Sequence, residues 1–170
     1  MTRFGWTIAT YVAALGATAS AFFHPLPRFI WNASTSVPIG LYAVHPARTL
    51  AITDLVVVQP PQDLAQFLAD RRYLPTGVPM LKRVLALPGQ TICRNARTIT
   101  VDGTAMGDAL DDDSHGRPLP VWQGCQRISS DQVFLMNWQS RDSLDSRYFG
   151  PLPRTTIVGR ADPLWTQEDD

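Results

Sequence analysis

Three hydroxyl side chains follow one another at Ser34, Thr35 and Ser36, and the chain then turns through Pro38 and Gly40. Proline and glycine at this spacing favour an extended turn, and a serine held on such a turn can present its Oγ to a cleft. A serine hydroxyl is a poor nucleophile until a nearby base takes its proton. The segment therefore predicts either a nucleophilic serine or an ordinary polar turn, and the presence of a base decides between them.

Lys82 is the candidate for that base, because none of the histidines lies in a catalytic setting. It lies in the otherwise apolar segment 78–85, next to a second cation, Arg83. Burial disfavours the charged ammonium, so a buried lysine can be neutral near pH 7 and accept a proton. In a strand the two cations point to opposite faces, so one can be buried while the other is solvated. Spacing alone does not decide between them; we assign Lys82 to the site.

Acyl transfer also needs hydrogen-bond donors for the oxyanion of its intermediate. Ser36 can offer its backbone N–H, and Ser34 can add its hydroxyl from the same turn. Asn32 and Thr35 are weaker alternatives for the second donor. The serine turn can thus supply both the nucleophile and the donors.

An uncharged segment, residues 4–23, precedes the serine turn. Twenty helical residues span about 30 Å, which is the thickness of one hydrocarbon core. Arg3 before the segment favours an N-terminus inside and a body outside. We therefore expect residues 1–24 to be a membrane anchor with a transmembrane helix, and residues 25–170 to be a β-rich domain outside the membrane. A cleaved signal peptide is the alternative, because two A-x-A patterns lie within residues 17–21.

Short apolar segments and turn residues dominate the rest of the chain. With 14 prolines, 11 glycines and 45% apolar residues, the composition favours short strands and many turns over a helical bundle. The spacing of Leu64, Phe67 and Leu68 predicts one amphipathic helix over residues 62–74. Strands are expected at residues 40–44, 55–58, 80–87, 91–94, 98–104 (with an Asp-Gly hairpin turn), 132–136 and 155–160. The prediction is a mostly β fold with one short helix.

The charges are balanced: lysines and arginines number 15, and so do aspartates and glutamates. This leaves no basic excess to attract nucleic acid, and we expect no nucleic-acid partner. Four aspartates between residues 108 and 113 lack the alternating ligands, central glycine and distal glutamate of a calcium loop. We expect a solvated loop there, and no metal ion or cofactor.

Two cysteines, Cys93 and Cys125, lie in the second half of the chain. If the body is exported, a disulfide closing their loop of roughly 33 residues would stabilise it by about 3–4 kcal/mol. Two buried free thiols are the alternative. A metal site would need more ligands than the sequence offers near them.

Four segments together resemble the sequence boxes of the signal peptidase I superfamily. Ser36-x-Pro38-x-Gly40-Leu41-Tyr42 is similar to the nucleophile box, and residues 53–58 are similar to the G-D-hydrophobic strand box, with Thr53 in place of glycine. Residues 81–89 match the lysine box, K-R-V-x-x-L-P-G, and residues 143–150 match the last box, S-x-D-S-R-x-F/W-G. The boxes occur in the family's order, and the most similar branch is that of the TraF-type peptidases of conjugative transfer systems.

The resemblance implies a mostly antiparallel β body with a surface resting against the membrane. It implies that Ser36 is the nucleophile of a Ser/Lys dyad and that Lys82 is the general base. It assigns the oxyanion-hole hydroxyl to Ser34.

The last box adds further roles. The resemblance implies that Ser143 orients the lysine amine and that Asp145 and Arg147 form a pair that holds the site, with the aspartate often counted as required in the TraF-type branch. From the residues alone, this pair has either a structural or a direct role. Residues 136–139, Met-Asn-Trp-Gln, replace the G-D-N-R-like run of ordinary signal peptidases, which favours the conjugation-specific branch.

The expected function is that of a serine endopeptidase at the bacterial inner membrane, single-pass, with its catalytic domain in the periplasm. Its partners would be membrane lipid and an exported precursor, namely the conjugative pilin subunit, whose maturation could end in hydrolysis or in cyclisation. A general signal peptidase I that serves many preproteins is the first alternative. The second is a membrane-tethered β-domain that assembles a transfer or secretion apparatus without catalysis.

Overall fold

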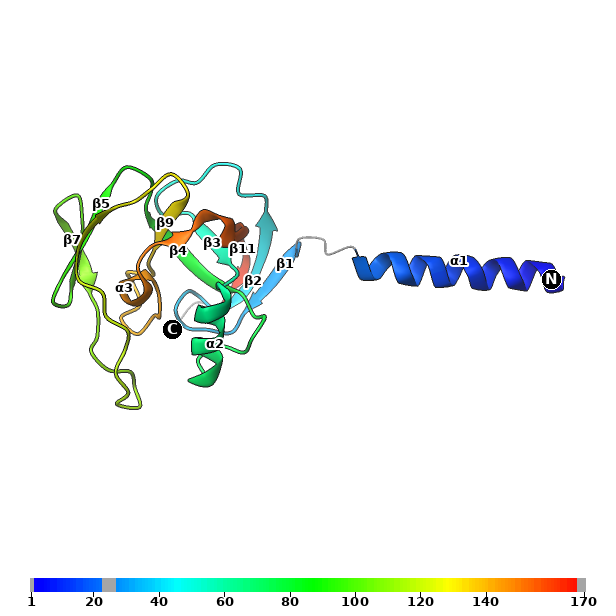
Figure 1. Cartoon of the computed structure of the whole chain (residues 1–170), viewed down its shortest axis with the longest axis horizontal. Coiled ribbons are helices and arrows are strands. Elements are labelled where there is room, and N and C mark those ends of the chain that lie inside the picture. Colours follow the sequence, from blue (N-terminus) through cyan, green and yellow to red (C-terminus); the bar gives the residue numbers. More distant parts are fainter. Residues whose placement is uncertain (1, 23–26, 168–170) are drawn as a thin grey trace.

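The computed structural model describes residues 2–22 and 27–167. Its first element, α1 (Arg3–Phe22), is one continuous helix of 20 residues (Figure 1). Within the described ranges, no helix is both long enough and apolar enough to cross a membrane, so the predicted transmembrane helix is not confirmed. The predicted domain boundary between residues 24 and 25 lies outside the described residues.

A seven-stranded antiparallel sheet forms the larger part of the body. Its order is β1-β2-β11-β3-β4-β9-β10. The strands are β1 (Phe29–Asn32), β2 (Gly40–His45), β3 (Leu55–Val58), β4 (Met80–Ala86), β9 (Gln132–Leu135), β10 (Leu152–Pro153) and β11 (Ile157–Thr166). In the central strands β3 and β4, every residue but Arg83 is buried, because side chains pack on both faces of the sheet.

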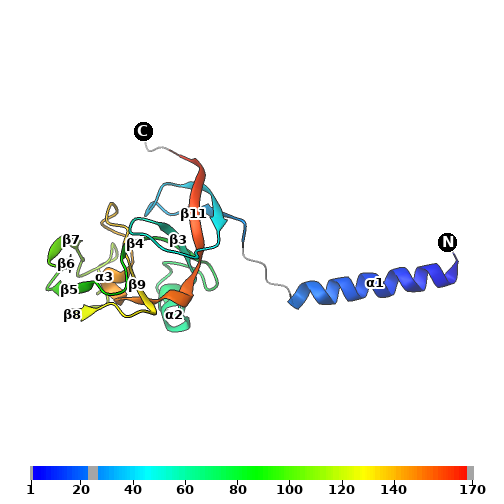
Figure 2. The same ribbon diagram turned by 90° about the horizontal axis from the view of Figure 1, so that it is seen from above.

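A second, four-stranded antiparallel sheet lies at one end of the body, as both views show (Figure 1, Figure 2). Its order is β7-β6-β5-β8, and its strands are β5 (Thr91–Asn95), β6 (Thr98–Val101), β7 (Thr104–Asp108) and β8 (Gly124–Arg127). Asp102 and Gly103 have φ angles of 49° and 84°, as a type I′ hairpin turn requires. The second sheet packs against β4 and β9 through Ile92, Ile99 and Val101. This single apolar cluster joins the two sheets.

Helix α2 (Gln62–Asp70) covers the larger sheet next to β3 and β4. Leu68 is buried, and Leu64 and Phe67 pack against the same cluster, as the helical spacing predicts. The helix ends four residues before the predicted Leu74, because the backbone turns at Arg72, whose φ is 59°. Two short helical turns complete the fold: α3 (Ser146–Phe149) and a 3₁₀ turn at Arg154–Thr156.

Two backbone positions bear on the sequence boxes. A Cβ atom at Gly40 would lie 2.1 Å from the carbonyl oxygen of Trp165, so only glycine lets β2 approach β11 this closely. Thr53, which stands where the family's box has glycine, has a φ of 78°. This left-handed conformation favours glycine, and a β-branched residue in it is strained.

A disulfide joins Cys93 to Cys125, which face each other on the paired strands β5 and β8. It closes a loop with a sequence separation of 32. β8 is exposed along its whole length and lies at the edge of its sheet. The covalent link therefore holds an edge strand that buries little apolar surface of its own.

The acidic cluster is mostly solvated, as predicted: Asp108, Asp111 and Asp112 are exposed, and Asp113 alone among the four is half-buried. Thr98 donates a hydrogen bond to Asp108, Arg97 pairs with Asp111, and Arg117 pairs with Asp113. The side chain of Asp113 is only 7% exposed. Arginine and hydroxyl side chains from before and after the cluster in sequence thus bind three of its four carboxylates.

Candidate active site

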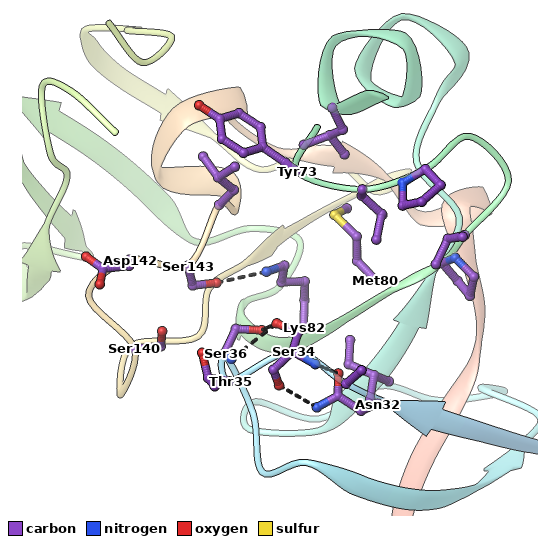
Figure 3. Close-up of a pocket in the computed structure, with 18 of the residues that line it drawn as sticks. Asn32, Ser34, Thr35, Ser36, Tyr73, Met80, Lys82, Ser140, Asp142 and Ser143 are labelled. Atoms are coloured by element: carbon purple, nitrogen blue, oxygen red, sulfur yellow. Dashed lines mark hydrogen bonds between the residues drawn. The ribbon is translucent and has the colours of Figure 1, made fainter. Parts of the chain in front are cut away.

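A cleft of about 630 Å³ opens between the serine turn, strand β4 and the loop that precedes α3 (Figure 3). Four of the predicted site residues line it: Ser34, Ser36, Lys82 and Ser143. The remaining two, Asp145 and Arg147, do not line the cleft and are buried next to the loop that carries Ser143. The structure thus brings residues 34–36, 82 and 143 together at one surface, although they lie far apart in sequence.

The serine turn is held by the side chain of Asn32, the last residue of β1. Its Nδ2 donates to the carbonyl oxygens of Ser34 (2.7 Å), Val37 (3.1 Å) and Pro38 (3.0 Å), and its Oδ1 accepts from the N–H of Ser34 (3.1 Å). Asn32 is buried, so these bonds fully engage its amide. Asn32 therefore shapes the turn, and its amide is not free to act as the oxyanion donor that the sequence allowed as an alternative.

Within the turn, Ser34 and Ser36 contact each other. Their Oγ atoms are 3.1 Å apart, and the backbone N–H of Ser36 donates to Ser34 Oγ over 3.3 Å. Ser36 is half-buried, whereas Ser34 and Thr35 are exposed. The two predicted oxyanion donors thus lie beside the predicted nucleophile, at the surface of the cleft.

Lys82 is the buried member of the two adjacent cations, with 5% of its surface exposed. Its Nζ donates a 2.8 Å hydrogen bond to Ser143 Oγ. Arg83 points to the other face of β4, where its Nη1 donates to the Thr53 carbonyl and its guanidinium lies 5.9 Å from the ring centre of Trp138. The alternation of a strand separates the two cations, as expected.

Burial is the main cause that lowers the pKa of Lys82, from its ordinary value of 10.5 to about 8. The negative charge of Asp145 opposes this shift, and the positive charge of Arg147 adds to it. A lysine with a pKa of about 8 is neutral in roughly one molecule in ten at pH 7, far more often than an ordinary lysine, so it can accept a proton. Among the described residues, no hydrogen bond links Lys82 to Ser36; both side chains line the same cleft (Figure 3).

Asp145 and Arg147 form a buried ion pair behind the cleft. Arg147 Nε and Nη2 donate to the two carboxylate oxygens of Asp145, each over 2.9 Å. Arg147 Nη2 also donates to the carbonyls of Ser140 (2.7 Å) and Ser143 (3.0 Å). Asp145 caps the N-terminus of α3 by accepting from the Arg147 N–H. The pair therefore fixes the backbone of the loop that holds Ser143 against Lys82.

Asn137 is a site residue that sequence reasoning did not find. It is 1% exposed; its Nδ2 donates to the Leu81 carbonyl (3.1 Å) and its Oδ1 accepts from the Arg83 N–H (2.9 Å). Its own N–H donates to Asp145 Oδ2 over 3.1 Å. The side chain of Asn137 thus holds β4 on both sides of Lys82, and its backbone N–H connects this strand to the ion pair. The available signal was a polar residue directly after an apolar strand.

Residues 1–165 match the family described as signal peptidase, peptidase S26. The chain belongs to this family. It is 34% identical over 165 residues to a probable conjugal transfer protein TraF of Sinorhizobium fredii, covering 91% of this chain and 85% of that protein. It is 33% identical over 147 residues to the conjugal transfer protein TraF of Agrobacterium fabrum, covering 79% and 81%.

A more distant relative, probable signal peptidase I-1 of Synechocystis, is 31% identical over 120 residues, covering 71% of this chain and 55% of that protein. Membership of the S26 family agrees with a serine peptidase, and the two TraF relatives are named as conjugal transfer proteins. The mostly β fold that the sequence predicts is the fold observed.

Proposed function

We propose that the protein is a serine endopeptidase in which Ser36 attacks the substrate carbonyl and Lys82 is the general base. The observation that carries the proposal is the burial of Lys82 on the cleft that Ser36 lines, because burial gives its amine a pKa of about 8. Exposed lysines are charged at neutral pH and cannot take a proton from serine. The Lys82–Ser143 hydrogen bond fixes the direction of the amine.

The reaction begins when the neutral Nζ of Lys82 takes the proton of Ser36 Oγ and that oxygen bonds to the scissile carbonyl carbon. Ser36 Oγ must first rotate away from Ser34 Oγ, and the Ser36 N–H must give up its 3.3 Å hydrogen bond to the same oxygen. The Ser36 N–H and the Ser34 hydroxyl then donate to the oxyanion. The Lys82 ammonium returns the proton to the leaving amine, which leaves an acyl-enzyme on Ser36. Either water or the amino terminus of the substrate completes the cycle.

The substrate proposed is an exported precursor, the conjugative pilin subunit. The similarity to proteins named as conjugal transfer proteins supports it. The similarity to a signal peptidase I favours a second candidate, a general signal peptidase that removes signal peptides from many preproteins. In both cases residues 25–170 form the peptidase domain at the periplasmic face of the bacterial inner membrane, and residues 1–24 attach it to the membrane.

Intact mass of a co-expressed pilin precursor tests the proposal, with the wild-type protein and with Ser36→Ala. A shortened product that is absent with Ser36→Ala would support the peptidase, and a product one water lighter than the linear peptide would show ring closure. An unprocessed pilin with processed secreted preproteins would favour the general signal peptidase. No processing of either substrate would contradict a peptidase and favour a scaffold without catalysis.

Membrane attachment has its own measurement. The full chain should sediment with membranes and resist extraction at alkaline pH, whereas a variant that lacks residues 2–24 should be released. Equal release of both proteins would contradict the role proposed for the N-terminal segment.

A further inference from the structure

The segment 109–119, which we call the brace, connects the second sheet to both sides of the active-site cleft. On one side it meets Tyr73, a cleft-lining residue between α2 and β4. The Tyr73 hydroxyl donates to Asp113, and Arg117 Nε donates to the same carboxylate over 2.7 Å. The Arg117 guanidinium also lies 5.0 Å from the centre of the Tyr73 ring. A tyrosine, a carboxylate and a guanidinium therefore form one closed cluster.

Backbone contacts reinforce this side of the brace. Arg117 Nη2 donates to the Arg71 carbonyl over 3.2 Å, and Arg71 Nη1 donates to the Pro118 carbonyl over 2.7 Å. The N–H groups of His115 and Arg117 both donate to Asp113 Oδ1. The brace and the segment that follows α2 are thus joined by reciprocal bonds, although some 40 residues separate them in sequence.

The other side of the brace packs against the loop that carries Ser143. Ala109 and Leu119 are buried with Tyr148 of α3, and Leu144 packs against them. The Leu110 N–H donates to the Tyr148 hydroxyl over 3.0 Å. Leu144 follows Ser143 directly and lines the cleft. The brace therefore contacts the Tyr73 wall and the Leu144 wall at the same time.

Asp113 is the central group of the cluster. Burial acts to raise the pKa of its carboxyl, but hydrogen bonds from Tyr73 and Arg117 outweigh burial and hold the pKa below its ordinary value. The carboxylate is therefore ionised at neutral pH, and its bonds to Tyr73 and Arg117 are of the strong, charge-assisted kind.

We propose that the brace fixes the spacing between the two walls of the cleft, and that the Tyr73–Asp113–Arg117 cluster is a positioning device for substrate binding. The effect on KM that we expect from this cluster rests on the proposed peptidase function. In Figure 3 Tyr73 lies on the side of the cleft away from Ser34 and Ser36, with Met80 and Lys82 between them, so a bound precursor segment would contact Tyr73 without displacing the reacting groups. The cluster acts on binding, and the chemistry of Ser36 and Lys82 does not depend on it.

Two variants test the cluster. Asp113→Asn removes the charge and keeps the size of the side chain, and Tyr73→Phe removes the hydroxyl and keeps the ring. Asp112→Asn is the matched control, because it makes the same change one residue away at an exposed position. With the precursor as substrate, we expect KM to rise about tenfold in both variants and kcat to stay within about twofold, since each loses a hydrogen bond to a charged group. The control should match the wild type.

Amide hydrogen exchange of residues 71–79 gives a readout that needs no activity. Exchange there should be faster in Asp113→Asn than in the wild type and in Asp112→Asn, because the segment loses its attachment. An unchanged KM, or a kcat that falls as much as kcat/KM, would overturn the positioning role. If the wild type processes no precursor, the proposed function has failed, and hydrogen exchange alone tests the brace. Equal exchange in the wild type, Asp113→Asn and Asp112→Asn would overturn the brace. Faster exchange in Asp113→Asn alone would uphold it.

Discussion

The two sides of the cleft are built in different ways. The side that carries Lys82 is buried, and Ser143, Asn137 and the Asp145–Arg147 pair hold it in a continuous network. The side that carries Ser36 is a partly exposed turn, in which Asn32 is the one buried polar side chain. The fold therefore fixes Lys82, the base we propose, in a buried network, whereas Ser36, the nucleophile we propose, lies on a partly exposed turn.

Lys82→Met should give the largest effect. Methionine fills the same buried space without an amine, so processing should fall by roughly a thousandfold or more, as expected when the base that activates a serine is lost. The free energy of unfolding should not decrease, because no cation remains to be buried. Processing kinetics and urea unfolding measure both quantities. Arg83→Met, on the opposite face, is the control and should retain most of the activity; equal losses in the two variants would refute the assignment.

Asp145→Asn tests whether the buried network carries stability. It leaves the guanidinium of Arg147 buried without its carboxylate, so the free energy of unfolding should fall by about 3–5 kcal/mol. Asp162→Asn breaks an exposed pair with Arg160 and should change it by less than about 0.5 kcal/mol. Denaturant unfolding of both variants makes the comparison, and similar small changes in the two would show that the buried pair does not hold the site.

Ser34→Ala tests the exposed side of the cleft. If the Ser34 hydroxyl donates to the oxyanion, kcat should fall by about a hundredfold, the usual effect of losing one such donor. Stability should change by less than about 0.5 kcal/mol, because the side chain is exposed. A kcat within a few-fold of the wild type would show that the N–H of Ser36 acts without it.

Asn137→Ala should combine a smaller loss of activity with a loss of stability. The variant leaves the Leu81 carbonyl and the Arg83 N–H without their partner on either side of Lys82. We expect the free energy of unfolding to fall by about 1–3 kcal/mol. We also expect the fold-decrease in kcat to be larger than the fold-change in KM. An activity that stays at the wild-type level in a less stable protein would limit Asn137 to a structural role.

The sequence predicted the central strands well, because β3 and β4 are apolar segments that stay buried in the folded protein. It missed the two-residue strand β10, and it missed β1 and β8. β1 exposes large apolar residues and β8 is exposed throughout, so neither has the alternation that marks a half-buried strand. It also missed α3, a helix of four residues, whose N-terminus is capped by Asp145 in a tertiary network.

For the site, residue chemistry led to Ser36 and Lys82, and the family boxes added Ser143, Asp145 and Arg147. The roles of Asn32 and Asn137 could not be read from the sequence, although Asn137 stands out as a polar residue directly after an apolar strand. The backbone groups that an asparagine amide binds are brought around it only when the chain folds, and the residues next to it in sequence do not predict them. The connection between Tyr73 and Asp113 is of the same kind, since 40 residues separate them.

The pH dependence of kcat/KM for precursor processing tests the central claim most directly, because it reports the protonation of the free enzyme's base. The ammonium form of Lys82 cannot accept the proton of Ser36, so activity should rise by about tenfold per pH unit below the pKa and level off above it. The midpoint should lie at the lowered pKa of Lys82, about 8. A profile that is flat from pH 6 to about pH 10, or that falls with rising pH, would contradict Lys82 as the base.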